Sequence, residues 1–163
     1  MQVHHNNVVQ VVSLLAYMLK DSDPNGLDVC FTQSKQKVNS GKSTKLSTAV
    51  SKAEFKGISD MRSRLSHILQ EHKNKFGTTT TPSRPWYKKA DSQKPLSFYV
   101  LTDGKWQPND VGPIIKALVD SMRAKQLPKE HVGIQFIRFG EDSQSMARLD
   151  HLDRGLGLKD IDM

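Results

Sequence analysis

The sequence contains a single cysteine, Cys30, and no long apolar run. One cysteine cannot form a disulfide within the chain, so this is not a small secreted domain held together by disulfides. No stretch approaches the roughly 18 consecutive apolar residues of a membrane-spanning helix. The apolar stretch near the N-terminus lacks the basic start and the small-residue cleavage site of a signal peptide. We therefore expect an intracellular protein, located in the cytoplasm.

The patterns that usually mark an enzyme are also missing. There is no dinucleotide-binding glycine fingerprint, no zinc-ligand spacing, and no nucleophile with a candidate base. The histidines are not spaced three or four residues apart, as two ligands on one helix face would be. We interpret all six as surface side chains: His4, His5, His67, His72, His131 and His151. The expectation is a protein that is not an enzyme.

Charge is abundant but unevenly placed. The net formal charge is +7, and 25% of the residues are charged. Residues 35–94 hold 14 Lys or Arg against 4 Asp or Glu, whereas the rest of the chain holds 10 against 13. Such a basic segment can attract nucleic acid, but more often it is a solvated surface. Aromatic side chains that could stack on bases are sparse there, so we favour the solvated surface.

Hydrophobic periodicity predicts alternating helices and strands. Helices are expected over residues 7–19, 57–76, 108–126 and 141–156. Strands are expected over residues 26–32, 96–102 and 131–140, with a further short strand an option at 37–39. This order indicates an α/β fold with a mainly parallel sheet and helices on both of its faces. We expect one domain over residues 1–163, with a long exposed loop at about 77–95.

The stretch SFYVLTDGKW, residues 97–106, contains the most informative junction. Its strand is apolar throughout, which suggests burial on both faces. The strand nevertheless ends in a carboxylate, Asp103, and Gly104 turns the chain directly afterwards. In open α/β sheets, ligands bind outside the carboxyl ends of the strands. Asp103 occupies that position and is therefore a candidate site residue.

Several stretches resemble the von Willebrand factor type A domain. LTDG at 101–104 looks like the strand-end motif that closes the metal site of that family. GISDM at 57–61 looks like the stretch that opens a helix and supplies the threonine of the site. VGIQFIRFG at 132–140 looks like the strand that follows, and DPNGLDVCF and LDHLDRGL are similar to an intracellular subgroup. The resemblance implies a three-layer, Rossmann-like fold that serves protein–protein interaction.

The resemblance also implies a metal-ion-dependent adhesion site, in which Mg²⁺ is held by oxygen ligands. Asp103 matches the aspartate of the third loop, and Ser59 stands where the family has threonine. The D-x-S-x-S motif that follows the family's first strand does not occur in this sequence. The chain therefore resembles a domain truncated at both ends. With only Ser59 and Asp103 present, we expect a degenerate site and weak or absent Mg²⁺ binding.

The missing first strand has a structural consequence. In the family it lies between the strands expected here at 26–32 and 96–102. Without it, both strands would expose a row of unpaired backbone N–H and C=O groups. Either the two strands pair directly, or another segment fills the gap, or the fragment folds poorly. We favour a truncated or degenerate domain.

Three aromatic residues are candidate contacts for a protein partner, since aromatic side chains often anchor interfaces. Trp86 and Tyr87 lie in the long loop, and they either contact a partner or hold the loop against the body of the protein. Trp106 follows the candidate site directly. It either shapes partner contacts or packs at the edge of the core.

An alternative function depends on the stretch NSGKST at 39–44, which contains the GKST of a phosphate-binding loop. The complete motif needs another glycine five residues before Gly41, and that position is Gln36. With the basic segment 35–94, this stretch supports a nucleotide- or nucleic-acid-binding α/β module. The favoured expectation remains a protein–protein interaction module of the type A kind.

Overall fold

The computed structural model describes residues 1–56, 59–76, 95–106 and 110–156. Five α-helices lie in these ranges: α1 (His5–Leu19), α2 (Ser43–Ser51), α3 (Met61–Phe76), α4 (Gly112–Ala124) and α5 (Ser143–Asp150). Shorter helical segments are η1 (Gln2–His4), η2 (Lys129–His131) and the π-helical η3 (His151–Gly155), which continues α5. The strands are β1 (Leu27–Cys30), β2 (Lys37–Ser40), β3 (Leu96–Thr102) and β4 (Val132–Arg138).

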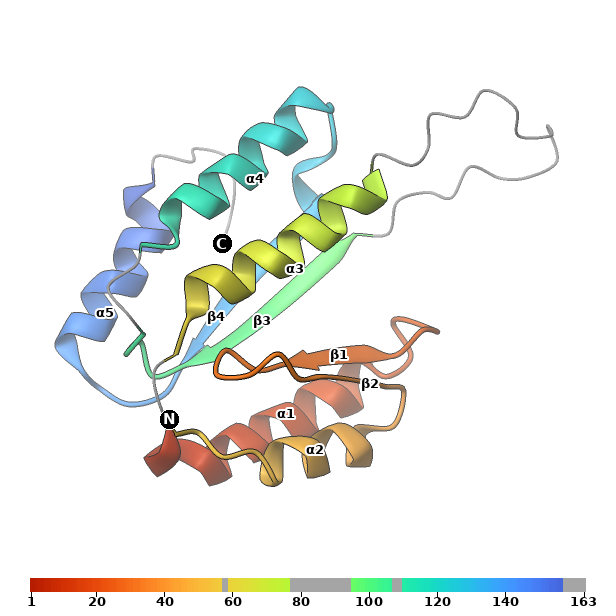
Figure 1. Ribbon diagram of the computed structural model, residues 1–163, viewed down its shortest axis with the longest axis vertical. Coiled ribbons are helices and arrows are strands. Elements are labelled where there is room, and N and C mark those ends of the chain that lie inside the picture. The colour runs from red at the N-terminus through yellow and green to blue at the C-terminus, as the bar shows by residue number, and fades with distance from the viewer. Residues whose placement is uncertain (57–58, 77–94, 107–109, 157–163) are drawn as a thin grey trace, which may run out of the picture.

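The strands form two separate sheets instead of the single mainly parallel sheet that we expected. β3 and β4 pair in parallel, with Leu96 opposite Val132 and Thr102 opposite Arg138. β1 and β2 form an antiparallel hairpin. The hairpin lies on the side of β3 away from β4, and β1 points to the same side of the molecule as β3 (Figure 1). In the part of the chain that the structure describes, no hydrogen-bonded ladder joins β1 to β3, so the direct pairing that was one of our options does not occur.

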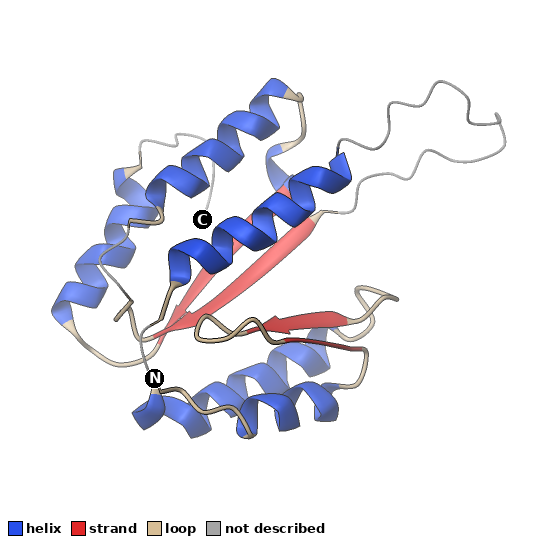
Figure 2. Cartoon of the chain, viewed as in Figure 1, coloured by secondary structure: helices blue, strands red, loops and turns tan. Residues whose placement is uncertain are grey.

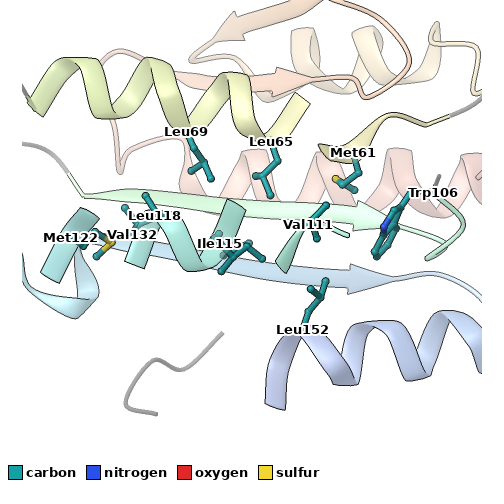
Figure 3. Close-up of a cluster of buried hydrophobic side chains, with 11 residues drawn as sticks. Met61, Leu65, Leu69, Trp106, Val111, Ile115, Leu118, Met122, Val132 and Leu152 are labelled. Atoms are coloured by element: carbon teal, nitrogen blue, oxygen red, sulfur yellow. The ribbon is translucent and has the colours of Figure 1, made fainter. Parts of the chain in front are cut away.

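The C-terminal part, residues 59–156, has the main hydrophobic core. Helix α4 begins with Pro113 in its first turn, where the missing N–H of proline costs nothing. Its apolar side chains recur at helical spacing and are buried: Ile115, Leu118, Val119 and Met122. Three of them, Ile115, Leu118 and Met122, pack with residues of α3, β4 and η3 in one cluster (Figure 3). The buried members of this cluster are Met61, Leu65, Leu69, Trp106, Val111, Ile115, Leu118, Met122, Val132, Ile134 and Leu152.

Helix α3 shows how the sequence directs this packing. Met61, Leu65 and Leu69 are four residues apart, so they lie on one face, and all three are buried. The Asp60 carboxylate accepts a hydrogen bond of 3.0 Å from the backbone N–H of Ser63. This contact satisfies one of the free N–H groups at the start of the helix, as a capping residue does.

The N-terminal part, residues 1–56, buries much less. Its buried apolar side chains come from α1 and α2: Val8, Ala16, Leu46 and Val50. Four large apolar side chains of this part are exposed: Val3, Leu14, Tyr17 and Met18. Figure 2 shows α1 and α2 together on one side of the hairpin. This part is therefore a thin layer of two helices and two short strands.

Most predicted elements are confirmed, with one omission. The helices expected at 7–19, 57–76 and 108–126 are α1, α3 and α4, and the helix expected at 141–156 is α5 with η3. The strands expected at 26–32, 96–102 and 131–140 are β1, β3 and β4, and the optional strand is β2. Helix α2 was not predicted, and only Leu46 and Val50 of its nine residues are buried. Among the helices that the structure describes, none combines the length and the apolar content of a membrane-spanning segment.

Candidate functional site at the carboxyl end of β3

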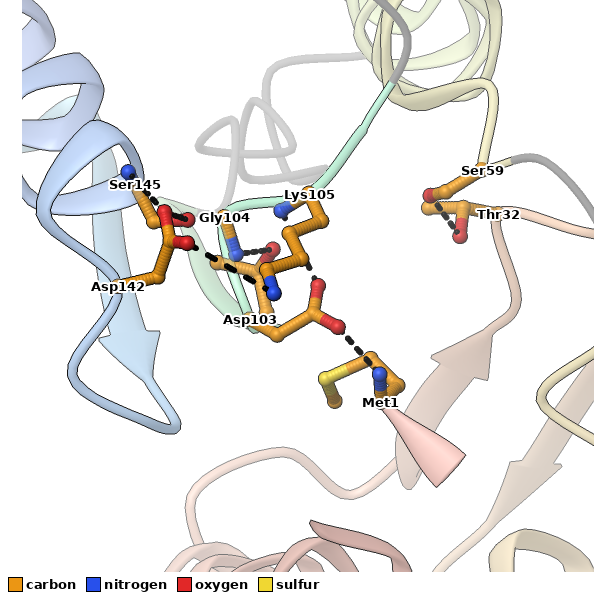
Figure 4. A network of polar contacts seen from close by, with 9 residues as sticks. Met1, Thr32, Ser59, Asp103, Gly104, Lys105, Asp142 and Ser145 are labelled. Atoms are coloured by element: carbon orange, nitrogen blue, oxygen red, sulfur yellow. Dashed lines mark hydrogen bonds and ion pairs between the residues drawn. The ribbon is translucent and has the colours of Figure 1, made fainter. Parts of the chain in front are cut away.

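The turn after β3 is built around a buried threonine. Thr102 is 4% exposed, and its hydroxyl oxygen accepts a hydrogen bond of 2.9 Å from the backbone N–H of Gly104. Gly104 has φ of +73°, a conformation that residues with a Cβ atom rarely adopt. The short side-chain-to-backbone bond fixes a tight turn. Asp103 therefore points out of the strand end in a defined direction (Figure 4).

Two donors hold the Asp103 carboxylate. One oxygen accepts a hydrogen bond of 3.1 Å from the backbone N–H of Lys105, and the other contacts the charged amino group of Met1. Burial raises the pKa of Asp103, but the hydrogen bonds from Met1 and Lys105, with the positive charge of the amino group, together outweigh it and lower the pKa below its usual value. The carboxylate is consequently ionised at neutral pH.

The start of α5 forms the other side of the turn. Asp142 caps this helix by accepting hydrogen bonds of 2.9 Å from both the backbone N–H and the hydroxyl of Ser145. These bonds lower the pKa of Asp142. A Cβ atom on Gly104 would lie only 2.3 Å from the Cβ of Ser145, so the turn and the helix touch directly. The amino group of Lys105 lies 3.7 Å from Asp142. Two ionised carboxylates, Asp103 and Asp142, thus flank Lys105.

Trp106 is part of the core. Only 8% of its surface is exposed, and it packs in the main hydrophobic cluster. The Arg148 guanidinium donates hydrogen bonds of 2.9 Å to the carbonyl of Gly104 and 3.3 Å to the carbonyl of Trp106, and it lies 5.1 Å from the Trp106 ring centre. This placement agrees with the packing role, and a partner would meet little of the side chain. Trp86 and Tyr87 lie outside the described residues.

Ser59 lies near the carboxyl end of β1, not against Asp103. Its hydroxyl donates a hydrogen bond of 2.7 Å to the hydroxyl of Thr32, a residue just after β1. Figure 4 shows this pair set apart from Asp103, with no dashed contact between them. Thr32 was not predicted as a site residue. The signal was available, because Thr32 follows its strand as Asp103 follows β3.

The N-terminal histidines help to attach α1 to this end of the molecule. The His4 ring stacks on Phe139, just after β4, with 6.1 Å between ring centres. The Nε2 atom of His5 lies 3.1 Å from the carbonyl oxygen of Val50 in α2. Both histidines are only partly exposed. The interpretation of these residues as simple surface side chains was therefore incomplete.

The interpretation of His131 as a surface side chain is wrong. His131 is 6% exposed, and its ring lies 6.1 Å from that of His72 on α3. The two residues are 59 positions apart in the sequence. His72 lies on α3 and His131 ends η2, so only the fold brings their rings together. Local spacing could not reveal this pair. His67, by contrast, is exposed and lies 3.7 Å from Glu71 one turn along the helix.

The GKST stretch does not form a phosphate cradle. Strand β2 ends at Ser40, and α2 begins at Ser43, so the order of strand, turn and helix is present. However, the four residues that would wrap around the phosphates, 37–40, are extended strand paired with β1. One lysine of the neighbouring basic segment forms an ion pair within the chain, because the Nζ atom of Lys37 lies 3.0 Å from a carboxylate oxygen of Asp28. These contacts favour a solvated surface over a nucleotide site.

The oxygen atoms of Asp103 and Ser59 do not form a set of ligands that could hold a metal ion tightly. Mg²⁺ requires near-octahedral oxygen ligands, usually with one or two carboxylates. Asp103 offers one carboxylate, whose oxygens already have donors, and Ser59 donates to Thr32. Within the described ranges, no group of three or more histidine, cysteine, aspartate or glutamate side chains could hold a metal.

No protein-family model matches the sequence, and neither a curated protein nor a solved structure matches it.

Proposed function

We propose that the chain is a protein-binding domain related to the type A domains, with an incomplete three-layer fold, and that it binds its partner at the carboxyl end of β3. The observation that carries this proposal is Asp103, which stands directly after the apolar strand of a parallel pair. Ligands bind at this end of open α/β sheets. We define the β3 rim as Asp103, Lys105 and Asp142.

The charge of the β3 rim indicates what kind of group it would bind. Without a metal ion, Asp103 and Asp142 present negative charge, and both carboxyl groups have a lowered pKa. Asp103 already contacts an ammonium group, that of Met1. A lysine or arginine side chain of a partner would displace the Met1 amino group from Asp103 and make the same kind of charge-assisted hydrogen bond. We therefore propose a basic partner surface and a degenerate metal site that is not needed for binding.

A thermal titration separates this proposal from the metal-dependent type A mechanism. A ligand that binds only the folded state raises the unfolding midpoint. We expect Mg²⁺ to leave the midpoint of the wild-type chain unchanged, and to do the same for Asp103→Ala. Asp120, an exposed residue of α4, provides the control variant Asp120→Ala. If Mg²⁺ raised the unfolding midpoint of wild type and of Asp120→Ala but not that of Asp103→Ala, the rim would bind metal and the proposal would be contradicted.

Site-specific photo-crosslinking in cells tests the rim itself. A photoreactive amino acid at Lys105, which has a largely exposed side chain beside Asp103, should form an adduct with a partner. The same group at Lys116, an exposed residue of α4, serves as the matched control. We expect the Lys105 adduct to be lost when Asp103→Ala is added. Equal adducts at both positions, or no effect of Asp103→Ala, would reject the rim.

A further inference from the structure

Strand β3 has a free edge although its sequence is that of an interior strand. Among the residues that the structure describes, β3 is hydrogen-bonded to β4 on one side only, and β1 is paired with β2 and with no other strand. The seven residues Leu96–Thr102 contain no charge and no proline. Edge strands of soluble proteins usually carry a charged residue, a proline or a bulge, and these features prevent pairing with other chains. The free edge of β3 therefore has none of these safeguards.

One hydrogen bond identifies the backbone groups at this edge. The carbonyl of Thr102 accepts a bond of 2.8 Å from the N–H of Phe139, which follows β4. The N–H and C=O of one residue point to the same side of a strand, and successive residues alternate. The groups that point to β4 are thus those of residues 96, 98, 100 and 102. Those at the free edge belong to Ser97, Tyr99 and Leu101.

The side chains of β3 also fit an incomplete sheet. Leu96, Phe98 and Val100 pack against the core cluster but remain partly exposed. Tyr99 and Leu101, on the opposite face, are partly exposed as well. A strand in the interior of a parallel sheet normally buries both faces. An additional strand would cover more of each of these side chains.

We propose that the free edge of β3 binds an extended segment of a partner protein, which adds as a parallel strand between β3 and β1. β1 and β3 point to the same side of the molecule, so one strand could run parallel to both (Figure 1). The segment would be apolar at alternate positions, and main-chain hydrogen bonds would supply its affinity, as in other cases of strand addition. The inference rests on the proposed protein-binding function but uses a surface separate from the β3 rim.

Residue-resolved hydrogen exchange of the dilute, full-length chain tests the free edge without any ligand. We expect the amides of Ser97, Tyr99 and Leu101 to exchange at least about tenfold faster than those of residues 98, 100 and 102, which point to β4. Equal protection of the two sets would show that the edge is already paired and would overturn the proposal. Protection that rises with protein concentration, together with a dimer in sedimentation, would assign the edge to a second copy and overturn it too.

A peptide titration then tests strand addition. The probe is a labelled peptide with the sequence of β4, VGIQFIR, because β3 pairs with that sequence in parallel. Ser97 has an exposed side chain and a free-edge N–H, so Ser97→Pro removes one donor, whereas Ser97→Ala keeps it. We expect Ser97→Pro to weaken binding about tenfold and Ser97→Ala to leave it unchanged. Equal binding by both variants, or no binding by wild type up to about 1 mM peptide, would overturn the proposal.

The variant Asp103→Ala, in the β3 rim, distinguishes a wrong strand-addition proposal from a wrong proposal for the rim. Asp103→Ala should bind the peptide as wild type does, because Asp103 lies beyond the strand end. Ser97→Pro should keep the Lys105 crosslink. Unchanged protection at residues 98, 100 and 102 verifies that Ser97→Pro is folded. If Ser97→Pro unfolds, the exchange experiment on the wild-type chain still decides the question, since it needs no variant.

Discussion

The two parts of the molecule bury their apolar side chains very differently. The C-terminal part, 59–156, packs helices on a parallel strand pair around one cluster, and every buried member of that cluster comes from it. The N-terminal part, 1–56, has an antiparallel hairpin, two helices and only four buried apolar side chains. It also carries most of the exposed large apolar side chains of the described chain, including Leu14, Tyr17 and Met18.

This difference indicates that the N-terminal part depends on its neighbour for stability. A two-stranded hairpin is at best marginally stable alone, and small units bury too little surface to offset their chain entropy. Side-chain contacts attach it to the C-terminal part: Met1 with Asp103, His4 with Phe139, Thr32 with Ser59, and Gln36 with Arg64. We infer that the two parts have unequal local stability, with the weaker one attached near the β3 rim.

Matched core truncations should give the largest effects. Ile115 on α4 and Leu46 on α2 are both 1% exposed. Truncating a buried Leu or Ile to Ala removes apolar contacts and leaves a cavity, and the cost depends on how far the site can relax. We expect Ile115→Ala to lower the free energy of unfolding by about 4 kcal/mol and Leu46→Ala by about 2 kcal/mol. Urea unfolding measures both values.

Hydrogen exchange should show where each truncation acts. Leu46→Ala should speed exchange in α1 and α2 while leaving the amides of β4 protected, because the weaker part opens locally. Ile115→Ala should speed exchange in both parts. If Leu46→Ala instead increases exchange equally in α2 and β4, the protein unfolds as one cooperative unit, and the proposed inequality is wrong.

Gly104→Ala should have the next largest effect, because the turn that carries Asp103 has no room for a Cβ atom. Alanine would be strained at φ of +73° and would overlap Ser145 at 2.3 Å. We expect a loss of about 2–4 kcal/mol, from the backbone strain and the displacement of α5 together. The thermal midpoint and the exchange of α5 amides would report the change.

Gly133→Ala is the control for this substitution. Gly133 lies in β4, and a Cβ atom there would meet nothing within 4 Å. Its effect should stay within about 0.5 kcal/mol, as for most substitutions without a specific clash. Similar losses for both glycine variants would show that the contact between Gly104 and Ser145 does not limit the packing of α5 on the turn.

The sequence predicted the elements that have strong periodicity or burial. Helix α4 and strand β3 were predicted because a helical apolar stripe and a long apolar run are both visible locally. Asp103 was recognised for the same reason, since a carboxylate that ends an apolar strand is a local pattern. Helix α2 was missed because its stripe has only Leu46 and Val50. Local pattern strength thus limited the prediction of elements.

Features that depend on distant residues could not be predicted. One mainly parallel sheet was expected, with the pairing of β1 and β3 left open; the described strands form two sheets, and no local pattern encodes which strands pair. His131 lies beside His72 only because the fold brings η2 against α3. Likewise, no spacing rule could place the Met1 amino group on Asp103, a residue 102 positions away.

The contact between Met1 and Asp103 gives the smallest predicted effect and joins the two parts directly. The pKa of Asp103 is lowered in the folded chain, so the contact stabilises the fold above the unfolded-state value of about 3.9 and loses its contribution as pH falls through the lowered pKa. NMR titration should place the Asp103 midpoint below that value, and acetylation of Met1 should raise it. The midpoint of Asp142, which is lowered by Ser145, should not move on acetylation. Equal shifts of both carboxyl groups would mean that Met1 acts through the general charge of the surface, and that Asp103 is not the residue that fastens the N-terminal part to the β3 rim.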